Sequence, residues 1–275
     1  KDIHINDYVY VKRAGDVIPD IDRVELKKRK NIKKIIIPTK CPSCLSTLKQ
    51  VHNQVALKCL NTKKCIPQIE GAIIHFISRK GMNIIGIGNQ IIRELIEKKI
   101  ISRPADIYSL AENDFNKLER VGERSIQNYL SSVEKSKQVI FSKFIYALGI
   151  KEVGESSSKS LAREFDTIDD LIRSSLDDLL KIDDVGPIVA ENIIEYLNDS
   201  DHRKNINDLI KSGINIIYSK VKSHDKTVVI TGSFKKYSRE NLKNKLELVG
   251  YKVTGTVTKK TNLLVCGDKP GSKLS

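Results

Sequence analysis

The chain has 275 residues, of which 40% are hydrophobic, so it is long enough for two or three domains with packed cores. Lysine and arginine outnumber aspartate and glutamate by 48 to 34, and the net charge of +14 favours a polyanionic partner, nucleic acid before an anionic membrane. No apolar run of about 18 residues and no signal peptide is present, so we expect neither a membrane span nor export. Five cysteines are too few for a disulfide scaffold and favour a reducing compartment, the cytoplasm, where clustered thiols more often bind metal.

The net charge is unevenly divided along the chain. Residues 1–81 carry 17 basic and 7 acidic side chains, residues 82–218 carry 18 and 23, and residues 219–275 carry 13 and 4. The positive excess therefore lies at the two ends, which indicates separate modules rather than a uniformly basic protein. Within the middle piece, residues 82–145 have a net charge of +2 and residues 146–218 one of −7.

Residues 1–26 show the alternating pattern of short β-strands. Apolar side chains recur at every second position around Val9 and Val11, and a Gly-Asp pair then interrupts the pattern as a hairpin turn does. Two strands with open edges are not stable alone in water, so we interpret this segment as the end of a small barrel whose other strands are missing. Residues 27–40 form a basic linker that begins with four consecutive basic residues, either a solvated loop or a contact for the phosphate backbone.

Four cysteines lie within residues 41–66 in a spacing typical of structural zinc. A pair separated by two residues is followed about fifteen residues later by a second pair, so the four thiolates can complete a tetrahedral shell: Cys41, Cys44, Cys59 and Cys65. A filled shell leaves no open position for catalysis, so the zinc is expected to be structural. The alternatives are unconnected reduced thiols, two disulfides, or His52 in place of one cysteine ligand.

The middle of the chain, residues 67–218, contains a repeat. A hydrophobic-glycine step recurs at intervals of 34, 32 and 32 residues, at Gly88, Gly122, Gly154 and Gly186. Small or apolar residues follow each glycine at the fourth and seventh positions, which is the spacing of one buried helix face. The unit is therefore helix, tight turn, helix, repeated four times. Further helix-like stretches lie upstream of the turns, such as residues 168–180 with a single leucine-rich stripe.

A glycine at the start of a helix has two interpretations. Either it allows a tight turn between packed helices, or it lets a phosphate approach the free N–H groups of the helix N-terminus. The occurrence of four such glycines in register favours the phosphate interpretation. The arrangement resembles the helix-hairpin-helix motif of DNA repair and joining proteins, most clearly in the Gly86-x-Gly88 pair. Other residues replace the first glycine of that pair in the other three units: Arg120, Glu152 and Asp184.

Two arginines beside these turns are candidate DNA contacts. Arg93 lies just past the first turn, and Arg124 lies beside the second. The alternative for either side chain is an i,i+4 pair on its own helix surface. The charge division makes the first two hairpins, with Gly86, Gly88 and Gly122, the better candidates for direct phosphate contact through backbone N–H groups.

Residues 223–275 have the pattern of a small α/β domain. The sequence predicts a buried strand over 226–233, an amphipathic helix over 238–249, and strands over 252–257 and 262–266. Cys266, at the end of the last strand, is expected to be a buried thiol.

Three segments of this last piece resemble the opening of a BRCT domain whose later helices are cut off: Val229-Ile230-Thr231-Gly232, residues 250–253 and residues 259–265. The resemblance implies a phosphate-binding role for Thr231 and Lys273, or contact with a protein or a DNA end. A turn residue and a solvated lysine are the alternative roles.

The order of the modules resembles that in the C-terminal half of bacterial NAD+-dependent DNA ligases. Two segments add to the match, residues 13–19 in the barrel end and residues 147–155 in the third hairpin. The resemblance implies a multidomain, mainly α fold in which residues 1–26 close an OB-fold, and it adds Arg13 to the DNA contacts. It also implies a monomer that seals 5′-phosphate/3′-hydroxyl nicks in duplex DNA during replication and repair, after AMP is transferred from NAD+ to an active-site lysine.

That lysine lies in a Lys-x-Asp-Gly motif in the ligase family, and no such tetrapeptide occurs in this sequence. NAD+ and Mg2+ are therefore expected to bind outside this chain, and no catalytic residue is predicted within it. We expect the chain to bind nicked duplex DNA without adenylylating itself. The alternative is a non-enzymatic DNA-binding or scaffold protein of DNA repair.

Overall fold

The computed structural model describes residues 2–268 apart from 16–17, 51–55, 120 and 219–225. The chain divides into two compact units, Lys1–Cys65 and Ile66–Ser275. Among the helices of the described residues, none combines the length and the apolar character that crossing a bilayer requires.

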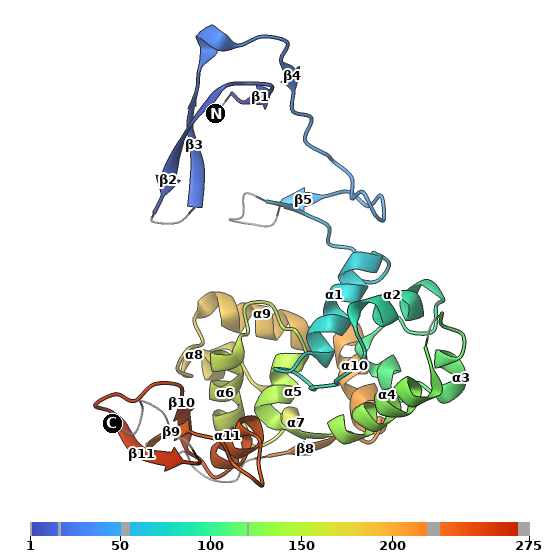
Figure 1. Ribbon diagram of the computed structural model, residues 1–275, viewed down its shortest axis with the longest axis vertical. Helices are drawn as coiled ribbons and strands as arrows, with labels where there is room; N and C mark the ends of the chain where they lie inside the picture. The colour runs from blue at the N-terminus through green and yellow to red at the C-terminus, as the bar shows by residue number, and fades with distance from the viewer. Residues whose placement is uncertain (1, 16–17, 51–55, 120, 219–225, 269–275) are drawn as a thin grey trace. The chain divides into compact units, whose positions relative to one another are not determined.

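Short antiparallel pairs of strands make up the described part of the first unit (Figure 1). The pairs are β1 (His4–Ile5) with β4 (Lys33–Lys34), β2 (Val9–Ala14) with β3 (Ile18–Val24), and β5 (Lys49–Gln50) with β6 (Leu57–Lys58). A 3-10 helix, η1 (Leu26–Lys28), follows β3. The pairing of β2 with β3 confirms the hairpin predicted from the alternating pattern.

The β2–β3 hairpin keeps much of its apolar surface open. Tyr8, Val11 and Ile18 are exposed by 63%, 60% and 68%. Polar contacts hold its base together, since the Arg29 guanidinium donates to both carboxylate oxygens of Asp7 at 2.8 Å and lowers the pKa of that carboxyl. The described strands of the first unit form two-stranded pairs, and the larger barrel stays a prediction.

The second unit begins with a helical domain (Figure 1). Its helices are α1 (Ile66–Ile77), α2 (Asn89–Glu97), η2 (Pro104–Ser109), α3 (Glu112–Phe115), α4 (Glu123–Ser136), α5 (Phe141–Ala147), α6 (Glu155–Glu164), α7 (Ile168–Arg173), α8 (Leu176–Leu180), α9 (Pro187–Asn198) and α10 (Ser200–Lys211). Two short strands, β7 (Gln138–Ile140) and β8 (Asn215–Ile217), pair in parallel. One apolar core runs through the domain, with Phe76, Phe115 and Phe144 at most 1% exposed.

All four repeats bury the helix face that the sequence predicts. Helices α2, α4, α6 and α9 each begin at the residue after the repeat glycine. The side chains at the fourth position after that glycine are at most 1% exposed: Ile92, Ile126, Ser158 and Ala190. At the seventh position three side chains are fully buried and one is half-buried: Leu95, Leu161, Ile193 and Tyr129. Each repeat therefore contributes one helix to the common core.

The stretch 168–180 is not one helix, as its leucine stripe predicted, but is divided into α7 and α8. Ser175 starts the second helix with a capping box, in which its hydroxyl accepts from the Asp178 N–H and the Asp178 carboxylate accepts from the Ser175 N–H. The break turns part of the stripe outward, so Leu176 and Leu180 are 40% and 42% exposed.

A small sheet with one helix ends the described chain. It contains β9 (Thr227–Thr231), α11 (Arg239–Leu248), β10 (Lys252–Thr254) and β11 (Thr261–Cys266), with both β10 and β11 parallel to the central β9. This order confirms the predicted strand, helix, strand, strand. The prediction that Cys266 is buried is wrong, because β11 lies at an edge of the described sheet and its last residue is exposed.

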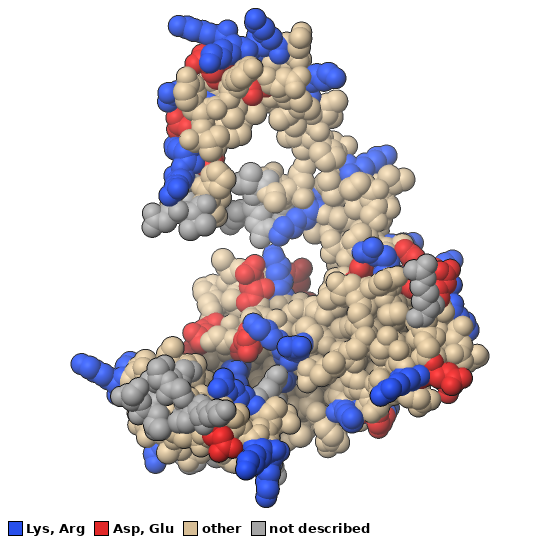
Figure 2. All heavy atoms as spheres, in the orientation of Figure 1, with Lys and Arg blue, Asp and Glu red and all other residues tan. Residues whose placement is uncertain are grey.

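The distribution of charge over the surface differs between the two units. In the first unit, Lys and Arg side chains crowd the end that lies between β3 and β4 (Figure 2). On the same view of the second unit, basic and acidic side chains are interspersed. On this face, the crowding of basic side chains in the first unit agrees with the positive excess that the sequence places in residues 1–81.

Candidate metal centre and nucleic-acid interface

The four predicted cysteine ligands converge in the first unit, where their Sγ atoms all lie within 4.8 Å of one another. The Sγ atoms of Cys41 and Cys65 are 3.9 Å apart, and those of Cys44 and Cys59 are 3.5 Å apart. Metal–sulfur bonds of about 2.3 Å in a tetrahedron separate the sulfurs by about 3.8 Å, whereas a disulfide separates them by about 2 Å. None of the four cysteines is in a disulfide with a described residue, and together they could hold one metal ion. His52 lies outside the described residues.

Short-range hydrogen bonds shape this cysteine cluster. The Cys41 N–H donates to the carbonyl oxygen of Ser46 at 2.8 Å, and the Asn61 side-chain amide donates to the Ser46 hydroxyl oxygen at 2.9 Å. Ser46 in turn lowers the pKa of the Cys44 thiol to about 6, through hydrogen bonds from its side chain and its backbone. Metal ions bind the thiolate form, which these hydrogen bonds favour at Cys44, whereas the pKa of the neighbouring Cys59 thiol is raised.

The four repeat glycines cap their helices without a side chain. Gly88, Gly122, Gly154 and Gly186 are the N-cap residues, with φ between −81° and −89° and no side-chain cap hydrogen bond. Helices α7, α8, α10 and α11, in contrast, are capped by side chains: Thr167, Ser175, Asp199 and Ser238. The first-turn N–H groups of α2, α4, α6 and α9 are therefore open to an external acceptor, although Pro187 removes one such group from α9.

Packing inside the chain does not explain these four glycines. A Cβ atom added at any of them would meet no atom of a described residue within 4 Å, and their φ values are ones that any residue adopts. A Cβ atom added to Gly81, by comparison, would lie 2.6 Å from the carbonyl oxygen of Phe76. The open space in front of the helix N-termini weighs against the packing interpretation and is suited to the close approach of a phosphate.

The residue two positions before the repeat glycine adopts a left-handed backbone. The φ angles are +99° at Gly86, +62° at Glu152 and +65° at Asp184, and Arg120 lies outside the described residues. Two non-glycine residues thus take a conformation that favours glycine, which keeps the shape of the turn. The replacements therefore change the charge of the third and fourth hairpins rather than their backbone.

Acidic side chains crowd the start of α6. The Asp184 carboxylate accepts a hydrogen bond from the Ser156 hydroxyl at 2.7 Å, and Glu155 occupies the first turn. The first turn of α2 has no acidic residue, and that of α4 places Arg124 next to Glu123. A carboxylate at a helix N-terminus repels an approaching phosphate, so the start of α2, with no acidic residue in its first turn, provides a more favourable anion site than the start of α6.

The predicted arginines lie in different environments. Arg93 forms a forked ion pair with Glu70 of α1, with nitrogen–oxygen distances of 2.9 and 3.3 Å, instead of an i,i+4 pair. Arg124 and Arg13 are exposed and make no ion pair with the residues that the structure describes. Arg124 is thus free to reach a phosphate beside the second turn, whereas Arg93 joins α1 to α2.

The predicted phosphate-binding pair of the last domain is described only in part. Thr231 ends β9 and is 3% exposed, and the Arg239 side chain donates to the carbonyl oxygen of the next residue, Gly232, at 2.9 Å. Lys273 lies outside the described residues. Thr231 thus lies beside a tightly closed turn, in which a Cβ atom on Gly232 would lie 2.7 Å from the Gly267 carbonyl oxygen.

Two residues that the sequence did not single out brace the first two turns. The Ser132 hydroxyl accepts from the Ile85 N–H at 2.7 Å, and the Glu94 carboxylate accepts from the Glu119 N–H at 2.9 Å. Their partners lie 47 and 25 residues away in sequence, and no local pattern signals such contacts.

Comparison with known proteins identifies both modules of the second unit. A family model of the helix-hairpin-helix motif matches residues 143–206, which include the last two repeat glycines. A model of the BRCA1 C Terminus (BRCT) domain matches residues 222–275.

Curated DNA ligases match the chain from end to end. It is 38% identical over 286 residues to the DNA ligase of Bacillus subtilis (strain 168), 40% identical over 283 to that of Francisella tularensis subsp. novicida (strain U112), and 37% identical over 282 to that of Marinomonas sp. (strain MWYL1). These alignments cover 99 to 100% of the chain but only 42 to 43% of each relative. The chain therefore belongs to the bacterial DNA ligase family and corresponds to a C-terminal portion with helix-hairpin-helix and BRCT modules.

Proposed function

We propose that this chain is the DNA-binding portion of an NAD+-dependent DNA ligase and that it holds nicked duplex DNA while the nick is sealed. One observation carries the proposal: glycines with open space in front of them cap four helices whose first-turn N–H groups have no side-chain cap. The similarity of the whole chain to DNA ligases supports duplex DNA as the anion.

The geometry supports a contribution to catalysis through positioning. Backbone N–H groups at the starts of α2 and α4 bind phosphates of the duplex, and Arg124 adds a charged contact. Phosphate contacts fix the register of the DNA without reading its sequence. A duplex held in this way presents the two ends of the nick to the rest of the enzyme in a reactive arrangement.

The modules have separate roles in this proposal. Arg13 and the basic linker add attraction to the DNA backbone, Thr231 and Lys273 are the candidate phosphate ligands of the last domain, and NAD+ and Mg2+ act outside this chain. The protein is a cytoplasmic, nucleoid-associated monomer. The assigned modules are the end of an OB-fold (1–26), a basic linker (27–40), a zinc finger (41–66), four helix-hairpin-helix units (67–218) and a BRCT domain (223–275).

We infer that the metal at the cysteine cluster is zinc with a structural role. Four thiol ligands at these separations suit a tetrahedral ion, and a full set of four protein ligands leaves no position for a substrate. When bound, zinc joins the segment around Cys41 and Cys44 to the segment around Cys59 and Cys65.

An electrophoretic mobility shift with nicked and intact duplexes tests the proposed function. We expect micromolar or tighter binding of the nicked duplex at about 50 mM salt, and a loss of affinity of tenfold or more at about 200 mM salt. Different duplex sequences should bind with affinities within tenfold of one another, because the contacts are to phosphates. Failure to bind any duplex at the lower salt, or a sequence preference above tenfold, would contradict the proposal.

Arg124 and Arg93 form a matched pair for a second experiment. We expect Arg124→Gln to weaken duplex binding about 3- to 10-fold and to reduce the slope of log K against log salt by about 1, because one phosphate contact is lost. Arg93→Gln should leave that slope unchanged, because Glu70 already holds the Arg93 guanidinium. Equal slopes for wild type and Arg124→Gln in a salt titration would exclude Arg124 as a contact.

A further inference from the structure

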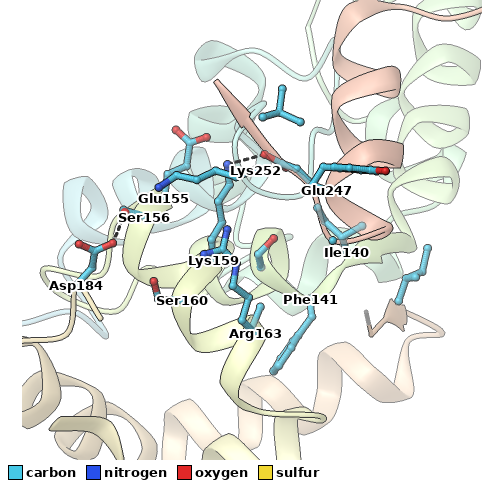
Figure 3. A pocket seen from close by; sticks show the side chains of 16 residues that line it. Ile140, Phe141, Glu155, Ser156, Lys159, Ser160, Arg163, Asp184, Glu247 and Lys252 are labelled. Atoms are coloured by element: carbon cyan, nitrogen blue, oxygen red, sulfur yellow. Dashed lines mark hydrogen bonds and ion pairs between the residues drawn. The ribbon is translucent and has the colours of Figure 1, made fainter. Parts of the chain in front are cut away.

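A side chain of α11 in the last domain pairs with a side chain of α6 in the third hairpin. The Lys159 ammonium on α6 and the Glu247 carboxylate on α11 are 2.8 Å apart, although 88 residues separate them in sequence. Both side chains point into the same hollow (Figure 3) and are largely shielded, with 30% and 16% exposed. This is a contact between two domains that no local pattern in the sequence predicts.

The charges on the two helices are complementary beyond this one pair. Helix α6 has an acid and a base four residues apart, Glu155 and Lys159, and α11 has the opposite order, Lys243 and Glu247. A hydrogen bond from Lys80, together with the charges of Lys159 and Lys243, lowers the pKa of the Glu155 carboxyl. Residues four apart lie on one face of a helix, so each helix carries two opposite charges on one face, and Glu155 itself pairs with Lys80 at 2.9 Å.

The same complementarity holds for the two domains as wholes. Residues 146–218, which include α6, have a net charge of −7, whereas residues 219–275, which include α11, have one of +9. The hollow between them has a volume of about 340 Å³ and also has an apolar lining, with Phe141 on one side and Tyr251 and Val253 on the other. Partial removal from water strengthens the attraction between the paired charges.

We propose that the last domain docks on α6 through a salt-sensitive latch centred on the Lys159–Glu247 ion pair. The third hairpin then serves as a docking surface for a domain of the same chain, and the first two hairpins remain open for an anion. The Lys159 side chain keeps 30% of its surface exposed, so salt screens the pair in part and the latch loosens as ionic strength rises.

Carbodiimide crosslinking tests this proposal, because it joins a carboxylate directly to an amine that touches it. We expect wild type at about 0.1 M salt to give a Lys159–Glu247 link within the monomer, identified by mass spectrometry of the digested chain. The yield should fall several-fold at about 1 M salt. Absence of this link at the lower salt, or its occurrence only in covalent dimers, would overturn the proposal.

A charge-exchange series provides the controls. Lys159→Glu places two carboxylates opposite each other and should reduce links between residues 66–218 and 226–268 about fivefold, whereas adding Glu247→Lys should restore a link between positions 159 and 247. Lys204→Glu makes the same charge change at an exposed site on α10 and should leave the yield unchanged. Wild-type yields in Lys159→Glu with intact circular dichroism, or no recovery on charge exchange, would overturn the latch.

Discussion

The double variant Gly88→Asp/Gly122→Asp is expected to bind nicked duplex DNA at least about tenfold more weakly than wild type while its helical domain becomes no less stable. Aspartate is a favoured N-cap residue, and its carboxylate would accept hydrogen bonds from the first-turn N–H groups and interact favourably with the helix dipole. The same carboxylate would occupy the phosphate site and repel the phosphate. The DNA would then lose charge-assisted hydrogen bonds that contribute about 1.5 to 3 kcal/mol each. Fluorescence anisotropy would measure affinity, and thermal unfolding would measure stability.

The opposite directions of the two effects separate the phosphate role from the packing role. An added Cβ meets nothing at Gly88 or Gly122, so the chain itself gives no reason for a loss of stability. Gln127→Asp, an exposed site on α4, adds one negative charge away from the turn and should change affinity less than threefold. The pair Gly154→Asp/Gly186→Asp should have a smaller effect than the first pair. Unchanged affinity in Gly88→Asp/Gly122→Asp would show that these turns do not bind DNA.

The second large effect is expected at the cysteine cluster. Cys65→Ser should reduce bound zinc from one equivalent per chain to well below half, and the segment from Cys41 to Cys65 should lose its protection from amide exchange. Structural zinc supplies about 10 to 16 kcal/mol of binding free energy in small zinc modules, which is folding free energy for such a segment. Atomic emission spectroscopy would count the metal, and exchange mass spectrometry would follow the segment.

Cys266→Ser is the matched control for this experiment, since it removes an exposed thiol outside the cluster. It should retain one equivalent of zinc and the protection of the 41–65 segment. A Cys65→Ser chain that still holds one equivalent would refute the four-cysteine site, and a wild-type chain with well under one equivalent would refute zinc itself.

Local periodicity in the sequence was enough to predict the elements that position the site. The glycine repeat located the starts of α2, α4, α6 and α9, because a buried helix face needs apolar residues at fixed spacing. The cysteine spacing identified a cluster that the structure draws within 4.8 Å. Glu152 and Asp184 show that the hairpin turn tolerates residues other than glycine at its left-handed position, which sequence reasoning did not foresee.

These local patterns did not predict contacts between segments that are distant in sequence. The break between α7 and α8 depends on the capping box of Ser175 and Asp178, which competes locally with a continuous leucine stripe. Arg93 pairs with Glu70 on another helix rather than along its own. The Lys159–Glu247 pair joins two domains, and only the folded chain brings its members together.

We propose that backbone N–H groups at the first two repeat glycines hold the duplex. Amide chemical-shift mapping on the 15N-labelled chain tests it directly, by titration with nicked duplex. We expect the largest changes at the first-turn amides of α2 and α4, from Asn89 and Gln90 and from Glu123 and Arg124. Changes confined to the basic linker over 27–40, with these first-turn amides unaffected, would contradict it.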